Sequence, residues 1–126
     1  MIKREQVFTE NAPAAVGPYS QGIKSNGFLF ISGQLPIDME TGEFPKPIGE
    51  QAKCCLNNLE AIAKEAGTSL QNAVKLTVFL TDMNDFTEVN AAYSEFFPNT
   101  PPARSCIAVS ALPKNAEIEI EAIVAC

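Results

Sequence analysis

The apolar residues of segment 48–66 repeat at the spacing of an α-helix that buries one face. They stand at offsets 0, 4, 7, 8, 11, 14, 15 and 18 from Ile48, which matches a period of 3.6 residues. Gly67 follows directly, and glycine favours the left-handed conformation in which many helices end. A helix with one apolar stripe must pack against a second layer, so the rest of the chain has to provide that layer.

The segments around this helix carry the alternation of β-strands. Asn26-Gly27 stands between two apolar segments, 16–24 and 28–32, and this dipeptide favours the type I′ turn of a β-hairpin. After the helix, the aliphatic residues of 74–80 occupy every second position, which is typical of a half-buried strand.

A second helix is predicted after this strand. Asp85 and Glu88 have the three-residue spacing of a capping box, with aspartate in the place of serine or threonine. The apolar residues that follow have helical spacing until a proline stops the helix: Phe86, Val89, Tyr93, Phe96, Phe97 and then Pro98.

Two strand patterns fill the remainder of the chain. Residues 105–112 are continuously apolar or small, which is typical of a strand buried on both faces. Residues 117–124 alternate glutamates with apolar residues, so this strand carries a carboxylate on every second position. The order of strands, helix, strand, helix and strands predicts an α+β fold with both helices on one face of a sheet. The length of 126 residues fits a single domain, 1–126.

The chain contains no histidine. This excludes Ser-His-Asp and Cys-His nucleophilic triads and every zinc or iron site that uses imidazole ligands. No motif suggests a metal site built from carboxylates or cysteines alone. Proton transfer therefore falls to glutamate, aspartate, tyrosine, lysine or cysteine, or to a water molecule that they hold.

Charge and cysteine usage predict a soluble protein of the cytoplasm. Nine basic and fifteen acidic residues give a net charge of −6, and Lys3-Arg4 is the only adjacent basic pair, so a nucleic-acid partner is disfavoured. The N-terminus lacks the apolar run of a signal peptide, and no segment predicts a membrane span. The cysteines lack Cys-x-x-Cys spacing and are expected to be reduced: Cys54, Cys55, Cys106 and Cys126.

Arg104 stands out because no other charged residue occurs between Glu95 and Lys114. It follows the stiff segment Pro101-Pro102-Ala103 and opens an apolar strand. A guanidinium stays charged in proteins, and its planar fork suits a two-point contact with a carboxylate. That carboxylate belongs either to a glutamate of the last strand, in a structural ion pair, or to a small ligand. The chemistry of the residue does not decide between them.

Glu117, Glu119 and Glu121 share one face of the last predicted strand. The ordinary interpretation of three like charges is a solvated face. In the functional interpretation, a neighbouring subunit covers one of them, and burial raises its pKa towards neutrality. That glutamate then acts as a base that activates water.

Two short glycine-bearing segments border the hairpin strands: Gly17-Pro18-Tyr19-Ser20-Gln21 and Ser32-Gly33-Gln34. Glycine permits a close backbone approach to a ligand, and Tyr19 offers an aromatic wall with one hydroxyl. A β-bulge and an ordinary surface tyrosine explain the same residues equally well.

Asn90 and Cys106 are two further candidates. Asn90 lies among the apolar residues of the second helix and either hydrogen-bonds a loop or faces solvent. Cys106 is two residues from Arg104 and projects from the same strand face. Without a histidine base it is expected to be a packed thiol beside a pocket and not a nucleophile.

Five motifs, taken in the order in which they occur along the chain, resemble the reactive intermediate deaminase (RidA/YjgF) family. The resemblance covers about residues 11–125. No single motif is decisive, but five in order are specific. They are Gly17-Pro18-Tyr19-Ser20-Gln21, Ser32-Gly33-Gln34, Asn90-x-x-Tyr93, Pro102-Ala103-Arg104-Ser105-Cys106 and Ile118-Glu119-Ile120-Glu121-Ala122.

The resemblance implies a fold, an assembly and an activity. The fold is chorismate-mutase-like, with a mixed sheet and two helices, and it forms a homotrimer around an internal barrel with three clefts between subunits. The activity is hydrolysis of 2-imino acids, which form from the 2-enamino acids that PLP-dependent serine and threonine dehydratases release. The products are a 2-oxo acid and ammonia, and no metal or organic cofactor is required.

The resemblance also implies roles for individual residues. Arg104 is expected to bind the substrate carboxylate and Glu119 to activate the water. The remaining pocket residues are expected to be Tyr19, Ser32, Gly33, Asn90 and Cys106, with Tyr19 across an interface. Two alternatives stay open. One is a sensor or chaperone-like trimer that binds a small carboxylic acid without turnover, and the other, against the charge balance, is a ribonuclease or translation inhibitor.

Overall fold

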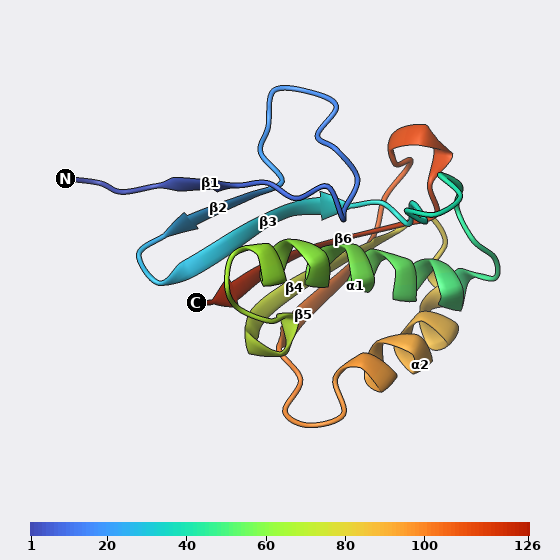
Figure 1. Cartoon of the computed structure of the whole chain (residues 1–126). Coiled ribbons are helices and arrows are strands. Elements are labelled where there is room, and N and C mark those ends of the chain that lie inside the picture. Colours follow the sequence, from blue (N-terminus) through green and yellow to red (C-terminus); the bar gives the residue numbers. More distant parts are fainter.

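The computed structural model describes residues 1–126 as one six-stranded sheet with two helices on a single face (Figure 1). The strands are β1 Glu5–Val7, β2 Gly22–Ser25, β3 Phe28–Gln34, β4 Ala73–Leu80, β5 Ala103–Ala108 and β6 Ile118–Ala125. The helices are α1 Ile48–Glu65 and α2 Phe86–Phe96, and short 3₁₀ turns occupy Leu70–Asn72, Met83–Asp85 and Pro113–Asn115. This confirms the predicted α+β class.

The sheet has the strand order β1-β2-β3-β6-β4-β5 and is mixed. Only β4 and β5 are parallel, and every other neighbouring pair is antiparallel. The β2–β3 hairpin turns at Asn26 and Gly27, whose φ angles of 55° and 83° confirm the predicted turn. The short strand β1 carries no sequence pattern that predicted it.

Helix α1 supplies much of the core, as its periodicity predicts. All eight apolar residues of that pattern are buried, in one cluster with the sheet: Ile48, Ala52, Cys55, Leu56, Leu59, Ile62, Ala63 and Ala66. Gly67 has φ +86° and donates to the Lys64 carbonyl while Thr68 donates to the Ala63 carbonyl, which closes a Schellman motif. The predicted end of the helix is thereby confirmed.

The capping box predicted at Asp85 is wrong. A 3₁₀ turn precedes α2, so Asp85 already has helical φ and ψ angles and its side chain caps nothing. Asp82 accepts instead from the backbone N–H of Asn84 at 2.9 Å. Glu88, the other expected member, turns away from its own helix and towards α1.

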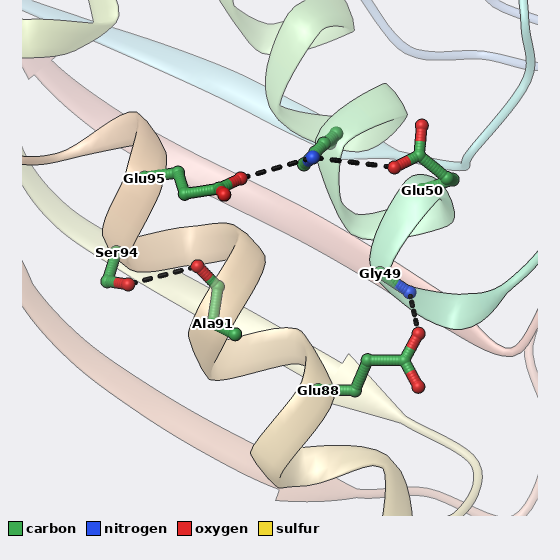
Figure 2. A network of polar contacts seen from close by, with 7 residues as sticks. Gly49, Glu50, Glu88, Ala91, Ser94 and Glu95 are labelled. Atoms are coloured by element: carbon green, nitrogen blue, oxygen red, sulfur yellow. Dashed lines mark hydrogen bonds and ion pairs between the residues drawn. The ribbon is translucent and has the colours of Figure 1, made fainter.

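Glu88 joins the two helices at the start of α1. Its carboxylate accepts from the backbone N–H of Gly49 at 2.9 Å, where the N-cap residue Pro47 provides no side-chain acceptor (Figure 2). A carboxylate at a helix N-terminus satisfies a free N–H and faces the positive end of the helix dipole. One turn further, Lys53 of α1 pairs with Glu95 of α2 at 3.1 Å. These contacts fix α2 against α1.

The interpretation of 105–112 as a strand buried on both faces is wrong. Strand β5 spans Ala103–Ala108 and stands at the edge of the sheet, with β4 as its only neighbour. Its residues alternate between exposed and half-buried from Ala103 to Ile107, and Ala108 is exposed as well; Ile107 is 48% exposed. A run of apolar residues does not distinguish a central strand from an edge strand that another surface covers.

The face of the sheet opposite the helices is open, and it is both apolar and acidic. Phe28, Phe30 and Ile107 expose large side chains there, beside Glu119 and Glu121. No helix of the structure combines the length and the apolar character needed to cross a membrane.

Candidate functional site

The carboxylate of Glu119 lies against the backbone of Gly33. Strand β3 bulges beside β6, so that Ser32 and Gly33 together oppose Glu121 between two regular pairs. A Cβ atom at Gly33 would collide with the Glu119 carboxylate. A side chain at Gly33 would therefore have to displace the Glu119 carboxylate, and the alternative of a β-bulge at Ser32-Gly33 is confirmed.

Buried polar contacts fix the segment that carries Tyr19. Gln21 accepts from the backbone N–H of Thr9 at 2.7 Å and donates to the Pro13 carbonyl at 2.9 Å. The Ser32 hydroxyl donates to the Ser20 carbonyl at 2.6 Å. The segment is thereby anchored to the end of β3, while the Tyr19 side chain stays 48% exposed.

These residues border an open cleft of about 440 Å³ on the sheet face away from the helices. Its lining comprises Val16, Tyr19, Ser32, Gly33, Leu35, Pro113, Lys114, Glu119 and Glu121. Four of the residues proposed from the sequence thus meet in one place: Tyr19, Ser32, Gly33 and Glu119. Sequence reasoning missed Lys114, whose left-handed backbone (φ 57°) places it at the rim.

Glu119 differs from Glu121 of the same strand and from Glu117, which directly precedes β6. It is half-buried, and burial followed by the nearby charge of Glu121 raises the pKa of its carboxyl above the ordinary value. Glu121 is exposed. Glu117 points elsewhere and accepts from the Gln51 side chain at 3.1 Å. The partial burial and raised pKa of Glu119 make its carboxylate a stronger base than an ordinary glutamate.

Arg104 has no carboxylate partner in the chain. Both ion pairs of the structure involve Lys53, so the predicted alternative of an ion pair with the last strand is wrong for this chain. The guanidinium instead donates from Nη1 to the Asn90 Oδ1 at 2.7 Å. Its central carbon lies 4.8 Å from the Tyr93 ring centroid and 5.6 Å from that of Phe86. Arg104 is thus held without being neutralised.

Cys106 lies half-buried on the same face of β5 as Arg104. Burial raises the pKa of its thiol, and the charge of Arg104 opposes this shift only in part. The thiol is therefore protonated near neutral pH, which fits a wall residue and not a nucleophile. All four cysteines are free.

One chain does not bring Arg104 and Glu119 together, because they lie on opposite faces of the sheet. Strand β4 shows this: its residue Leu76 is buried beneath the helices and pairs with Arg104, whereas Phe79 pairs with Glu119. Paired residues share a face, and neighbouring residues of a strand alternate between faces. The candidate residues therefore fall into two groups, called half-sites below: Arg104, Asn90 and Cys106 in one, and the residues of the cleft around Glu119 in the other.

No group of three or more cysteine, aspartate or glutamate side chains is placed to hold a metal ion. The phenyl and phenol rings around Arg104 were not anticipated as part of a site. The motif Asn90-x-x-Tyr93 pointed to Tyr93, but the apolar face of α2 explains that residue equally well.

Comparisons with known proteins match nearly the whole chain. The model of the family described as Endoribonuclease L-PSP matches residues 9–126. A RutC family protein of Sinorhizobium fredii is 55% identical over 121 residues, 95% of this chain and 96% of the relative. The 2-iminobutanoate/2-iminopropanoate deaminase of Escherichia coli is 49% identical over 120 residues, 93% of this chain and 94% of the relative.

A solved structure agrees with the fold. The crystal structure of Escherichia coli TdcF with bound serine superposes with a TM-score of 0.92 at 42% identity, over 97% of this chain and 98% of that one. The family match, the relatives and the fold agree with one another, and the chain belongs to the RidA/YjgF family.

Proposed function

We propose that the protein hydrolyses small 2-imino acids to 2-oxo acids and ammonia. The observation that carries this proposal is the state of Arg104, a guanidinium fixed in place with no carboxylate to neutralise it. Such a group is complementary to the carboxylate of a small ligand. A relative of about half identical sequence is named as a deaminase of 2-iminobutanoate and 2-iminopropanoate, which supports this substrate class.

The complete site requires a second subunit, since the two half-sites lie on opposite faces of the sheet. We propose a homotrimer in which β5 of one subunit, with Arg104, meets the Glu119 cleft of the next. A head-to-tail contact of this kind uses two different surfaces, and with a threefold rotation between subunits it closes into a ring. The proposed assembly is chorismate-mutase-like, with an internal barrel. It would bury the exposed edge of β5 and the apolar side chains of the open face, Phe28, Phe30 and Ile107.

The proposed reaction needs no covalent bond between enzyme and substrate, because the carbon of a protonated imine is already electrophilic. Arg104 holds the substrate carboxylate. Glu119 takes a proton from water as its oxygen bonds to C2 and the C=N electron pair moves to nitrogen. The proton then returns to nitrogen, and the C–N bond breaks with its electron pair leaving on ammonia. The hydroxyl gives its proton to Glu119 as the C=O bond of the 2-oxo acid forms, and Glu119 passes that proton to the ammonia. Because the spontaneous reaction is fast, positioning supplies much of the acceleration.

The substrate comes from a class of enzyme that eliminates water from a hydroxyl amino acid. We expect this protein to speed the appearance of 2-oxobutanoate when it is added to a PLP-dependent threonine dehydratase, in proportion to its concentration. The measurement is 2-oxo acid formation in stopped flow, before spontaneous hydrolysis is complete. No acceleration, combined with tight binding of a small carboxylic acid, would favour a sensor that lacks turnover.

The family's description as an endoribonuclease points to a second test on the same protein. With a net charge of −6 and no basic stripe, the chain has little to neutralise phosphates. We expect RNA to stay intact. Cleavage that co-purifies with the protein and persists in Arg104→Ala would assign the nuclease to a separate surface and leave the imine proposal to the dehydratase assay.

The trimer is a prediction of its own. We expect light scattering at micromolar concentration to give three times the mass of one chain, 13.6 kDa. The reason is that a monomer would leave Phe28, Phe30 and Ile107 exposed on one face and the two half-sites apart. A monomer mass with full deaminase activity would contradict the shared site.

A further inference from the structure

Helix α2 holds the Arg104 side chain through contacts that do not neutralise its positive charge. The guanidinium carbon lies 4.8 Å from the Tyr93 ring centroid and 5.6 Å from the Phe86 ring centroid. Aromatic faces attract a cation at these distances, and Tyr93 is only 6% exposed, which strengthens the attraction by excluding water.

The contacts of Arg104 use few of its hydrogen-bond donors. Asn90 accepts one N–H from Nη1 at 2.7 Å, and the rings accept none. A guanidinium has five N–H groups, so a fork remains for a two-point contact with a carboxylate. A glutamate in the place of the rings would fix the side chain equally well, but it would neutralise the charge and occupy the fork.

The hydroxyl of Tyr93 does not explain why a tyrosine stands there. It is buried and has no hydrogen-bond partner in the structure. A buried hydroxyl without a partner costs free energy of folding, so the useful part of the side chain is the ring. The ring also packs on Phe97, with centroids 4.9 Å apart, but Phe97 makes no such contact with Arg104.

We propose that Tyr93 and Phe86 are positioning residues that hold the Arg104 guanidinium, charged and with its fork open, for the incoming carboxylate. This inference rests on the proposed function, in which Arg104 binds the substrate. The rings act through Arg104, so their loss should weaken carboxylate binding and leave the water-activating step unchanged.

The test compares three leucine substitutions in one aromatic cluster. Tyr93→Leu is expected to weaken binding of 2-oxobutanoate, and to raise KM, by about 2- to 30-fold, the range of a partly desolvated cation–π contact, with little change in kcat. Phe86→Leu should act in the same direction but less, because its ring is farther from the guanidinium and half-buried. Tyr93→Phe keeps the ring and should bind as the unsubstituted protein does.

Phe97→Leu is the matched control. Phe97 is 5% exposed and lies in the same cluster, so its replacement disturbs packing similarly without removing a ring from Arg104. If the unsubstituted protein binds 2-oxobutanoate, and Tyr93→Leu and Phe97→Leu bind it equally well, the inference is overturned. Failure of the unsubstituted protein to bind 2-oxobutanoate or to hydrolyse imines would instead refute the proposed function. If Tyr93→Leu does not fold, Phe86→Leu against Phe97→Leu decides the question.

Discussion

Arg104→Ala is expected to lower kcat/KM for a 2-imino acid by about ten- to hundred-fold. The substitution removes the charge-assisted contact with the ligand carboxylate, an interaction on the order of 1.5–3 kcal/mol. The other arginine of the chain, Arg4, lines a separate cavity with Tyr19, Ser32 and Glu121. The loss should also appear as weaker binding of 2-oxobutanoate, measured by calorimetric titration, since the ligand carboxylate is the group that Arg104 contacts.

Arg104→Lys is the matched variant for this prediction. Lysine keeps the charge but neither the planar fork nor the flat surface that lies on Tyr93. We therefore expect only partial recovery of binding. Full recovery would show that the site requires a positive charge alone, and unchanged kcat/KM in Arg104→Ala would remove Arg104 from the site.

The local elements of the fold were predictable because their patterns are complete within short segments. The period of 48–66 fixes the buried face of α1, and Asn26-Gly27 fixes the hairpin turn. The edge position of β5 was not predictable in this way. It depends on pairing between segments far apart in the chain, and an apolar run looks the same whether a helix, a strand or another subunit covers it.

The candidate site shows the same division. The spacing of Arg104 and Cys106 places both on one strand face, which the structure confirms. That Arg104 and Glu119 occupy opposite faces of the sheet follows only from the register of β4 with its two neighbours. The contact of Glu119 with Gly33 arises from a bulge, and the rings around Arg104 come from a helix that the strand meets only after folding.

Glu119→Gln should fail differently from Arg104→Ala. The two side chains are nearly isosteric, so binding of 2-oxobutanoate is expected to stay within about two-fold, whereas kcat should fall. Loss of a general base costs typically about 10²- to 10⁴-fold, and here the fall should lie near the lower end because the uncatalysed reaction is quick. Stopped-flow kinetics measure the fall in kcat, and a calorimetric titration with 2-oxobutanoate measures binding, so the two effects are separated.

The pH profile gives a second readout for Glu119. A base must be deprotonated to accept a proton, so kcat/KM should rise as pH increases through the pKa of this carboxyl. Burial, followed by the charge of Glu121, raises that pKa, which places the rise at higher pH than an exposed glutamate would give. In Glu119→Gln the rise should disappear. If it persists, Glu119 is not the base, and Tyr19 or Glu121 becomes the candidate.

Co-expression of the two variants separates a base contributed by a neighbour from a base in the same chain. Arg104→Ala retains a complete Glu119 cleft, and Glu119→Gln retains a complete Arg104 half-site. If each site takes Arg104 from one subunit and Glu119 from the next, random mixing in a trimer restores about one quarter of the sites. If both residues served the same site from one chain, every mixed site would lack one of them, and activity would stay at the level of the separate variants. Recovery towards a quarter of the unsubstituted activity is therefore the expected result, and the opposite-face register of β4 is its physical reason.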